Sequence, residues 1–251
     1  MSQLGCGLRE DVMPNTTISF LGAVIVAQTF LAAAPILAKD QARPAKAAYS
    51  AMAPLDQYLM ADEKAEIALA RTAAPASISG GAQVMVLRRD GYATVAKGGN
   101  GFMCLVQRGW AASSDNPDFW NPKLRAPNCF NAPATKTYVQ IYFLKTKLAL
   151  AGKSKTEITQ TAQAALDKKE LPAIDPASMA YMMSKQQYLG DGPKSWHSHM
   201  MFFLPGDVSK GWGADLPDSP VMAQNDPEER LTILFVLAGK WSDGTPAPPM
   251  N

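Results

Sequence analysis

The chain has 251 residues and a formal net charge of +2, and 47% of its residues are hydrophobic while 18% are charged. This hydrophobic content excludes an intrinsically disordered protein, because burial of the apolar surface can offset the entropy lost when the chain orders. The near-neutral charge gives no reason to expect a nucleic-acid partner, since binding to nucleic acids depends on many cations directed at phosphates.

The first feature along the chain is an apolar run over residues 18–38 that contains no charged residue. Such a run is typical of a secretory signal peptide or of a membrane anchor. Ala32 and Ala34 offer a cleavage site and cleavage after Ala38 is an alternative, although the region before the run lacks the usual positive charge. We expect residues 1–38 to direct export to the periplasm or out of the cell, or to anchor the protein in a membrane if the segment is not cleaved.

Residues 39–54 are rich in Ala, Gln, Lys and Pro, which indicates a linker. One globular domain is expected to follow over residues 55–251. It opens with an Ala-, Glu- and Leu-rich segment over residues 55–74 that predicts a helix, with Asp62 and Glu63 favouring its N-terminus and Pro75 ending it.

Three short strands are predicted after this helix, over residues 82–89, 92–96 and 102–107. Asp90 and Gly91 separate the first two strands and form a dipeptide that favours a two-residue hairpin turn. Short turns join all three strands, so the sequence predicts an antiparallel meander.

The rest of the domain predicts helices and then strands. One helix begins near Pro133 and ends at Gly152, although its β-branched residues also suit a strand. A second helix, over residues 155–169, starts with a capping box formed by Ser154 and Glu157. Further strands are predicted over residues 179–188, 196–204 and 231–238. The last of these is almost continuously apolar, which favours a central place in the sheet.

These elements predict an α+β fold. We expect a single domain with a mainly antiparallel sheet of about six strands and two to three helices packed on it. No internal repeat and no second domain is visible in the sequence.

Two cysteines, Cys104 and Cys129, lie within the predicted domain. An even number of cysteines in an oxidising compartment predicts a disulfide bond. This bond would close a loop of about 26 residues and stabilise the fold by roughly 3.5 kcal/mol in the chain-entropy model. Two buried free thiols that never meet are the alternative.

The two histidines of the chain, His197 and His199, lie within one predicted strand. Residues at i and i+2 of a strand face the same side, so the two imidazoles are expected to point together and could bind zinc or copper. A catalytic zinc needs a third protein ligand. The candidates for it lie in loops near strand ends: Asp191, Asp207, Asp215 and Asp243. The alternative is a pair of ordinary hydrogen-bonded core histidines.

Methionines gather in the two strands around these histidines, at Met179, Met182, Met183, Met200 and Met201. Thioethers beside imidazole suit Cu(I) in an exported protein. Methionine is equally a flexible core residue, and these five have no ligand spacing of their own, so core packing is the alternative that we favour.

Large aromatic side chains in loops or near strand ends are candidates for ligand binding, together with one arginine: Trp110, Trp120, Trp196, Trp212, Trp241 and Arg125. Loops held by a sheet are where binding sites usually lie, and aromatic faces suit sugars, peptides or planar ligands. A guanidinium group could bind a carboxylate or phosphate through two parallel hydrogen bonds. The alternative is that the tryptophans anchor the loops and the arginine is solvated.

The function that we predict is non-catalytic binding, by an exported domain, of a small molecule or an envelope partner through the aromatic loops. The alternative is a metal-dependent enzyme, or a metal carrier, that uses zinc or copper at His197 and His199. A purely structural envelope component is a third possibility. The sequence leaves open whether the protein is an enzyme, because no G-x-S-x-G, H-E-x-x-H or C-x-x-C motif is present. A membrane contact is expected only through residues 1–38.

Overall fold

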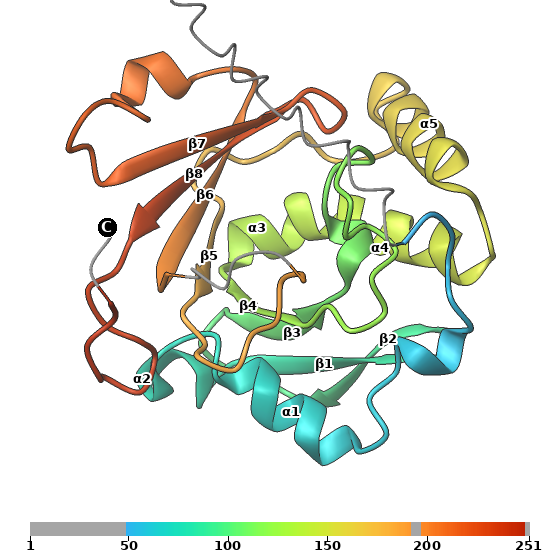
Figure 1. Cartoon of the computed structure of the whole chain (residues 1–251), viewed down its shortest axis with the longest axis horizontal. Coiled ribbons are helices and arrows are strands. Elements are labelled where there is room, and N and C mark those ends of the chain that lie inside the picture. The colour runs from blue at the N-terminus through green and yellow to red at the C-terminus, as the bar shows by residue number, and fades with distance from the viewer. Residues whose placement is uncertain (1–48, 192–196, 249–251) are drawn as a thin grey trace, which may run out of the picture. The chain divides into compact units, whose positions relative to one another are not determined.

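An eight-stranded mixed sheet runs through the computed structural model, which describes residues 49–191 and 197–248 (Figure 1). The strands lie in the order β2-β1-β3-β4-β5-β6-β8-β7. They span Gln83–Arg88 (β1), Gly91–Ala96 (β2), Met103–Gln107 (β3), Ala126–Phe130 (β4), Met179–Met182 (β5), His199–Pro205 (β6), Val221–Asp226 (β7) and Leu231–Leu237 (β8). Neighbouring strands are antiparallel except β1 and β3, which run parallel.

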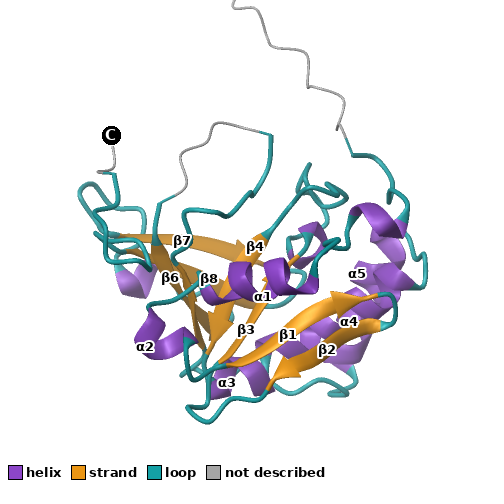
Figure 2. Ribbon diagram, turned by 90° about the horizontal axis from the view of Figure 1, so that it is seen from below, coloured by secondary structure: helices purple, strands orange, loops and turns teal. Residues whose placement is uncertain are grey.

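Helices cover both faces of this sheet, with α1 and α4 on opposite sides (Figure 2). The described residues form the helices Glu63–Arg71 (α1), Ala76–Ser79 (α2), Ala132–Lys136 (α3), Tyr138–Leu150 (α4) and Lys155–Asp167 (α5). Shorter 3-10 turns span Leu55–Gln57 (η1), Gly109–Ala111 (η2) and Ser209–Trp212 (η3). In the part of the chain that the structure describes, no helix has the length and apolar character needed to cross a membrane.

The alternation of side chains along the strands divides the hydrophobic core in two. On one face, Cys104, Val106 and Cys129 pack against Leu69 and Ala70 of α1. The other face packs against α3 and α4 through the larger cluster, which includes Met103, Leu105, Phe130, Tyr138, Ile141 and Phe203. The two faces of the sheet therefore pack against different helices, and the disulfide lies on the face that α1 covers.

The predicted disulfide is confirmed. Cys104 and Cys129 are directly opposite each other in β3 and β4, and their sulfur atoms are 1.94 Å apart. Both residues are fully buried. The bond links β3 to β4, the two strands that flank the irregular segment 108–125. The apolar run 18–38, on which the expected export depends, lies outside the described residues.

The α+β class and most predicted elements are confirmed, including the capping box at Ser154. β8 has a neighbour on each side but lies next to the edge strand β7 and is only partly buried, so the predicted central place is wrong. Two strands were not predicted. β4 holds proline and asparagine, and β7 lies within a stretch that reads as a Gly-, Pro- and Asp-rich loop. The helix predicted within residues 55–74 is confirmed as α1, which begins at Glu63 with Asp62 as its N-cap, and residues before it form η1. It ends at Arg71, ahead of Pro75.

The predicted meander is also wrong. The hairpin of β1 and β2 forms as expected, but the chain then crosses the start of β1 and enters β3 parallel to it. Gly98 allows this crossing, because a Cβ atom there would lie 2.0 Å from the backbone nitrogen of Gln83. The backbone N–H of Gln83 donates to the carbonyl of Phe102, which holds the new strand beside β1.

Candidate functional site

A pocket of about 260 Å³ lies between α4, the segment that joins β3 to β4, and one face of β6, β8 and β7. Its volume is just below the range of roughly 300–1,000 Å³ that is usual for small-molecule sites. Its polar lining comprises Arg108, Ser113, Asn116, Tyr138, His199, Gln224, Asp226 and Glu229, and its apolar side chains include Leu124, Met182, Leu189, Ile233 and Phe235. The pocket therefore combines an apolar wall with several titratable groups.

His199 is the first residue of β6, and its side chain is 8% exposed. Its Nδ1 lies 2.7 Å from the carbonyl oxygen of His197. A carbonyl oxygen can only accept a hydrogen bond, so Nδ1 carries the proton and Nε2 has a free lone pair in the neutral ring. Nε2 is buried and has no hydrogen-bond partner among the described residues. Burial lowers the pKa of His199, which favours this neutral form.

Two carboxylates line the same pocket. Asp226 ends β7 and accepts the backbone N–H of Glu229 at 3.0 Å. Glu229 forms an ion pair with Lys145 of α4, whose Nζ lies 2.6 Å from Oε1, and the two side chains are 6% and 4% exposed. Burial raises the pKa of Asp226, and it also raises the pKa of Glu229 despite the nearby ammonium group.

The ammonium group of Lys145 is fully engaged on the protein. Besides Glu229, it donates to the backbone carbonyl of Ala112 at 2.9 Å and to that of Ala111 at 3.4 Å. Asp226 forms no ion pair of its own among the described residues. The pocket therefore contains one more buried carboxylate than the neighbouring cations balance.

Tyr138 of α4 forms part of the pocket wall and is held by packing. Its ring stacks on that of Phe203, with ring centroids 3.9 Å apart. Burial, with a further contribution from the negative charge of Glu229, raises the pKa of Tyr138 well above its ordinary value. Tyr138 is therefore neutral at physiological pH.

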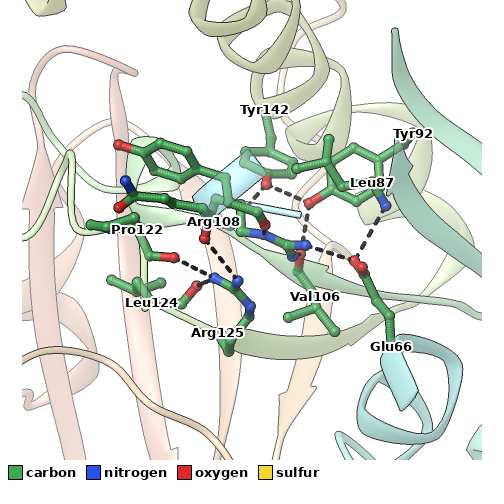
Figure 3. A network of polar contacts seen from close by, with 11 residues as sticks. Glu66, Leu87, Tyr92, Val106, Arg108, Pro122, Leu124, Arg125 and Tyr142 are labelled. Carbon is green, nitrogen blue, oxygen red and sulfur yellow. Dashed lines mark hydrogen bonds and ion pairs between the residues drawn. The ribbon is translucent and has the colours of Figure 1, made fainter. Parts of the chain in front are cut away.

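A second buried ion pair lies beside this pocket, between Arg108 and Glu66 (Figure 3). Arg108 lines the pocket, but its guanidinium group donates to Glu66 at 2.9 Å and to the carbonyls of Tyr58 and Val106. Its backbone N–H donates to the hydroxyl of Tyr142. Each of the three guanidinium nitrogens of Arg108 therefore has an acceptor within the protein, and we assign this network to the stability of the fold.

The tryptophans proposed as a ligand site are not gathered in one place. Trp110 and Trp120 are 0% and 3% exposed and form part of the core, where Nε1 of Trp110 donates to Thr146. Trp212 is 51% exposed in η3. Trp241 lines a different cavity of about 390 Å³, and Trp196 lies outside the described residues. Trp110 and Trp120 therefore pack in the core, and the six proposed residues do not line one common cavity in the part of the chain that the structure describes.

Arg125 does not extend toward a ligand site. One terminal nitrogen of its guanidinium group donates to the carbonyls of Pro122 and Leu124, both at 2.8 Å, and the other donates to Gln57 (Figure 3). Burial, together with the charge of Arg108, lowers the pKa of Arg125 to about 10. Its donors hold the loop together.

The histidines take different positions, and the metal hypothesis gains no support. His197 precedes β6 and contributes its carbonyl group to His199. No group of three or more His, Cys, Asp or Glu side chains suited to a metal ion occurs within residues 49–191 and 197–248. The proposed third ligands have local partners: hydroxyl groups donate to Asp191 and Asp207, a backbone N–H donates to Asp215, and Lys185 pairs with Asp243. Among the methionines, Met182, Met183 and Met201 are buried as core residues.

No protein-family model, no curated protein and no solved structure shows significant similarity to this chain. The site therefore has to be understood from its own geometry. The predicted residues contribute His199 to it, whereas Tyr138, Lys145, Asp226 and Glu229 were not predicted. Lys145 and Glu229 are 84 positions apart, and no local sequence signal links them.

Proposed function

We propose that this chain is a binding protein for a small organic molecule, and that the ligand occupies the pocket between α4 and the β6–β8–β7 face. The observation that supports this proposal is that His199 lines the pocket and that its Nε2 is buried without a hydrogen-bond partner among the described residues. An unpaired buried polar atom costs roughly 1–3 kcal/mol of stability. A ligand that donates a hydrogen bond to Nε2 would recover this cost.

Supporting features surround the imidazole. Its position is set from both sides, by the hydrogen bond to His197 and by an edge-on contact with Phe235, whose ring centroid is 5.5 Å away. The hydroxyl group of Ser113, also on the pocket wall, donates to Asp115 instead of His199. An ordered acceptor with no hydroxyl nucleophile bonded to it suits binding better than covalent catalysis.

The test is a saturation-transfer NMR screen of the purified chain with small aromatic amines, alcohols and acids. Gln224 is exposed on the pocket rim, so Gln224→Trp should block the entrance without a folding cost. Gln160→Trp places the same ring on the exposed surface of α5 and serves as the matched control. We expect signals in the parent chain and in Gln160→Trp that disappear in Gln224→Trp.

A second variant addresses the imidazole itself. His199→Phe keeps a ring of similar size but removes the acceptor, and we expect it to fold and to weaken the binding of hydrogen-bond donors. If no compound distinguishes Gln224→Trp from Gln160→Trp, the pocket is not a ligand site and the proposed function is wrong.

A further inference from the structure

We infer that the ligand is a neutral phenol, a single aromatic ring whose hydroxyl group donates a hydrogen bond to Nε2 of His199. This inference rests on the proposed function and narrows it to one polar group and one charge state. It places the ligand in the part of the pocket beside the start of β6, away from the carboxylates at the β7–β8 turn.

The orientation of the imidazole is the first reason. His199 lies on the face of β6 that also carries Met201 and Phe203, two core residues on the side of α4. Its Nδ1 is turned back to the backbone carbonyl of His197, so Nε2, at the far end of the ring, points away from the backbone of this strand. Nε2 can only accept, and it has no partner among the described residues. The ligand group that meets it must therefore be a donor.

The strand registers give the second reason, because they surround the imidazole with apolar side chains. His199 is paired directly with Met182 of β5 and with Leu237 of β8. Phe235, two residues before Leu237 and therefore on the same face, contacts the imidazole edge-on, with ring centroids 5.5 Å apart. The groups next to the imidazole are thus hydrocarbon and a thioether.

Charge is the third reason. The carboxylates that line the pocket belong to the other end of β8, where Asp226 is paired with Leu231, six residues before Leu237. At about 3.4 Å per residue, the partners of Asp226 and His199 are on the order of 20 Å apart along this strand. An ammonium group at Nε2 would be buried without these counter-charges, and a carboxylate ligand has no proton to donate. A neutral hydroxyl group avoids both problems.

The size and lining of the pocket determine the rest of the ligand. A volume of about 260 Å³ is small for an organic ligand, and Leu124, Leu189 and Ile233 extend its apolar wall. A single flat ring suits this space. Since a thioether and a phenyl ring both make favourable contacts with a further ring, Met182 and Phe235 favour a phenol over an alkyl alcohol.

Phenol and toluene test the hydrogen bond, because a methyl group replaces the hydroxyl group and the shape is nearly unchanged. Both are titrated at pH 7 into the parent chain and into His199→Phe, and chemical-shift changes of the protein give the affinities. We expect the ratio of phenol affinity to toluene affinity to fall about tenfold in His199→Phe, the effect of one hydrogen bond to a buried acceptor. This ratio cancels the different hydration of the two compounds.

His197→Phe is the matched control. It removes the other imidazole, which is not among the groups that line the pocket, and keeps the backbone carbonyl that orients His199. The affinity ratio should therefore equal that of the parent chain.

A second measurement needs no variant. In the parent chain with isotope-labelled histidine, saturating phenol should shift the Nε2 resonance of His199 more than saturating toluene does. Benzylamine and benzoate, which are charged at pH 7, are expected to bind at least about tenfold more weakly than phenol.

The outcomes separate the two proposals. An affinity ratio that His199→Phe leaves unchanged, or an Nε2 resonance that phenol shifts no more than toluene, would overturn the phenol assignment, and so would tighter binding of benzylamine or benzoate. In each case, binding that is lost in Gln224→Trp would leave the proposed function standing. If His199→Phe does not fold, the Nε2 resonance decides. If none of the four compounds gives a response that Gln224→Trp removes, both proposals are wrong.

Discussion

Two buried ion pairs, Arg108–Glu66 and Lys145–Glu229, occur in the described part of the chain, and their surroundings differ. The first is closed, since the guanidinium group of Arg108 also donates to two backbone carbonyls and Glu66 accepts the N–H of Leu87 (Figure 3). The second borders a pocket and has a further buried carboxylate, that of Asp226, beside it. The Arg108–Glu66 pair thus stabilises the fold, whereas the Lys145–Glu229 pair has beside it a buried carboxylate, that of Asp226, without an ion pair of its own among the described residues.

Neutralising the acid of each pair tests whether the two ion pairs contribute differently to the stability of the fold. Glu66→Gln leaves the guanidinium group of Arg108 buried without a counter-charge, and we expect a loss of about 3–5 kcal/mol of unfolding free energy. Glu229→Gln should cost less, about 1–2 kcal/mol, because the charge of Lys145 still has the nearby carboxylate of Asp226, whose pKa it lowers. Urea unfolding of both variants measures the difference, and equal losses would contradict the distinction.

The disulfide belongs to the closed region, since Cys104 lies on β3, four positions before Arg108. Replacing both cysteines by alanine should lower the unfolding free energy by up to about 3.5 kcal/mol, the value expected for a loop of about 26 residues. Binding of compounds found in the saturation-transfer screen should be unchanged in the folded variant, because the disulfide faces α1 and the pocket lies on the side of α4. A loss of binding without a loss of stability would show that the regions are not independent.

A smaller effect is expected on the pH dependence of stability, through Asp226 in the pocket. Burial raises the pKa of Asp226 above its ordinary value of 3.8, so the folded chain holds this proton to higher pH than the unfolded chain does. Stability therefore falls, through this group, as pH rises above about 4 toward the folded-state pKa. Asp226→Asn removes this contribution, and we expect its stability relative to the parent to increase between pH 4 and pH 7.

Groups elsewhere act in the opposite direction. Hydrogen bonds lower the pKa of Glu157 and that of Asp243 to about 2, so their contributions are lost as pH falls below the ordinary carboxylate range. They are present in both chains and cancel in the difference between Asp226→Asn and the parent. Thermal unfolding at several pH values measures this difference, and a difference that is constant with pH would show that Asp226 titrates normally.

Some parts of the fold could be predicted from local patterns in the sequence. Period-two alternation correctly places His199, Met201 and Phe203 on one face of β6, because this pattern is local. The spacing of Cys104 and Cys129 correctly predicts the disulfide, although the strand that holds Cys129 was not recognised among the prolines around it. Local patterns therefore identified single elements and one cross-link.

The pocket could not be predicted in the same way. It depends on contacts between α4 and the turn after β7, where Lys145 meets Glu229, and on the parallel pairing of β3 with β1 that places the segment after β3. The burial of the individual tryptophans could not be predicted for a related reason. Loop sequence alone does not distinguish a ring that enters the core, as Trp110 does, from one that remains exposed, as Trp212 does.

The smallest expected effect tests this last distinction. Trp212 lies in η3 and is not among the residues that line the pocket, and its side chain is 51% exposed. Trp212→Ala should therefore change the unfolding free energy by less than about 0.5 kcal/mol and leave the signals of compounds found in the saturation-transfer screen unchanged. Trp110→Ala, in the core, should instead cost about 3–5 kcal/mol. Loss of these signals in Trp212→Ala, with stability retained, would place the ligand site at the exposed loop and count against the pocket around His199.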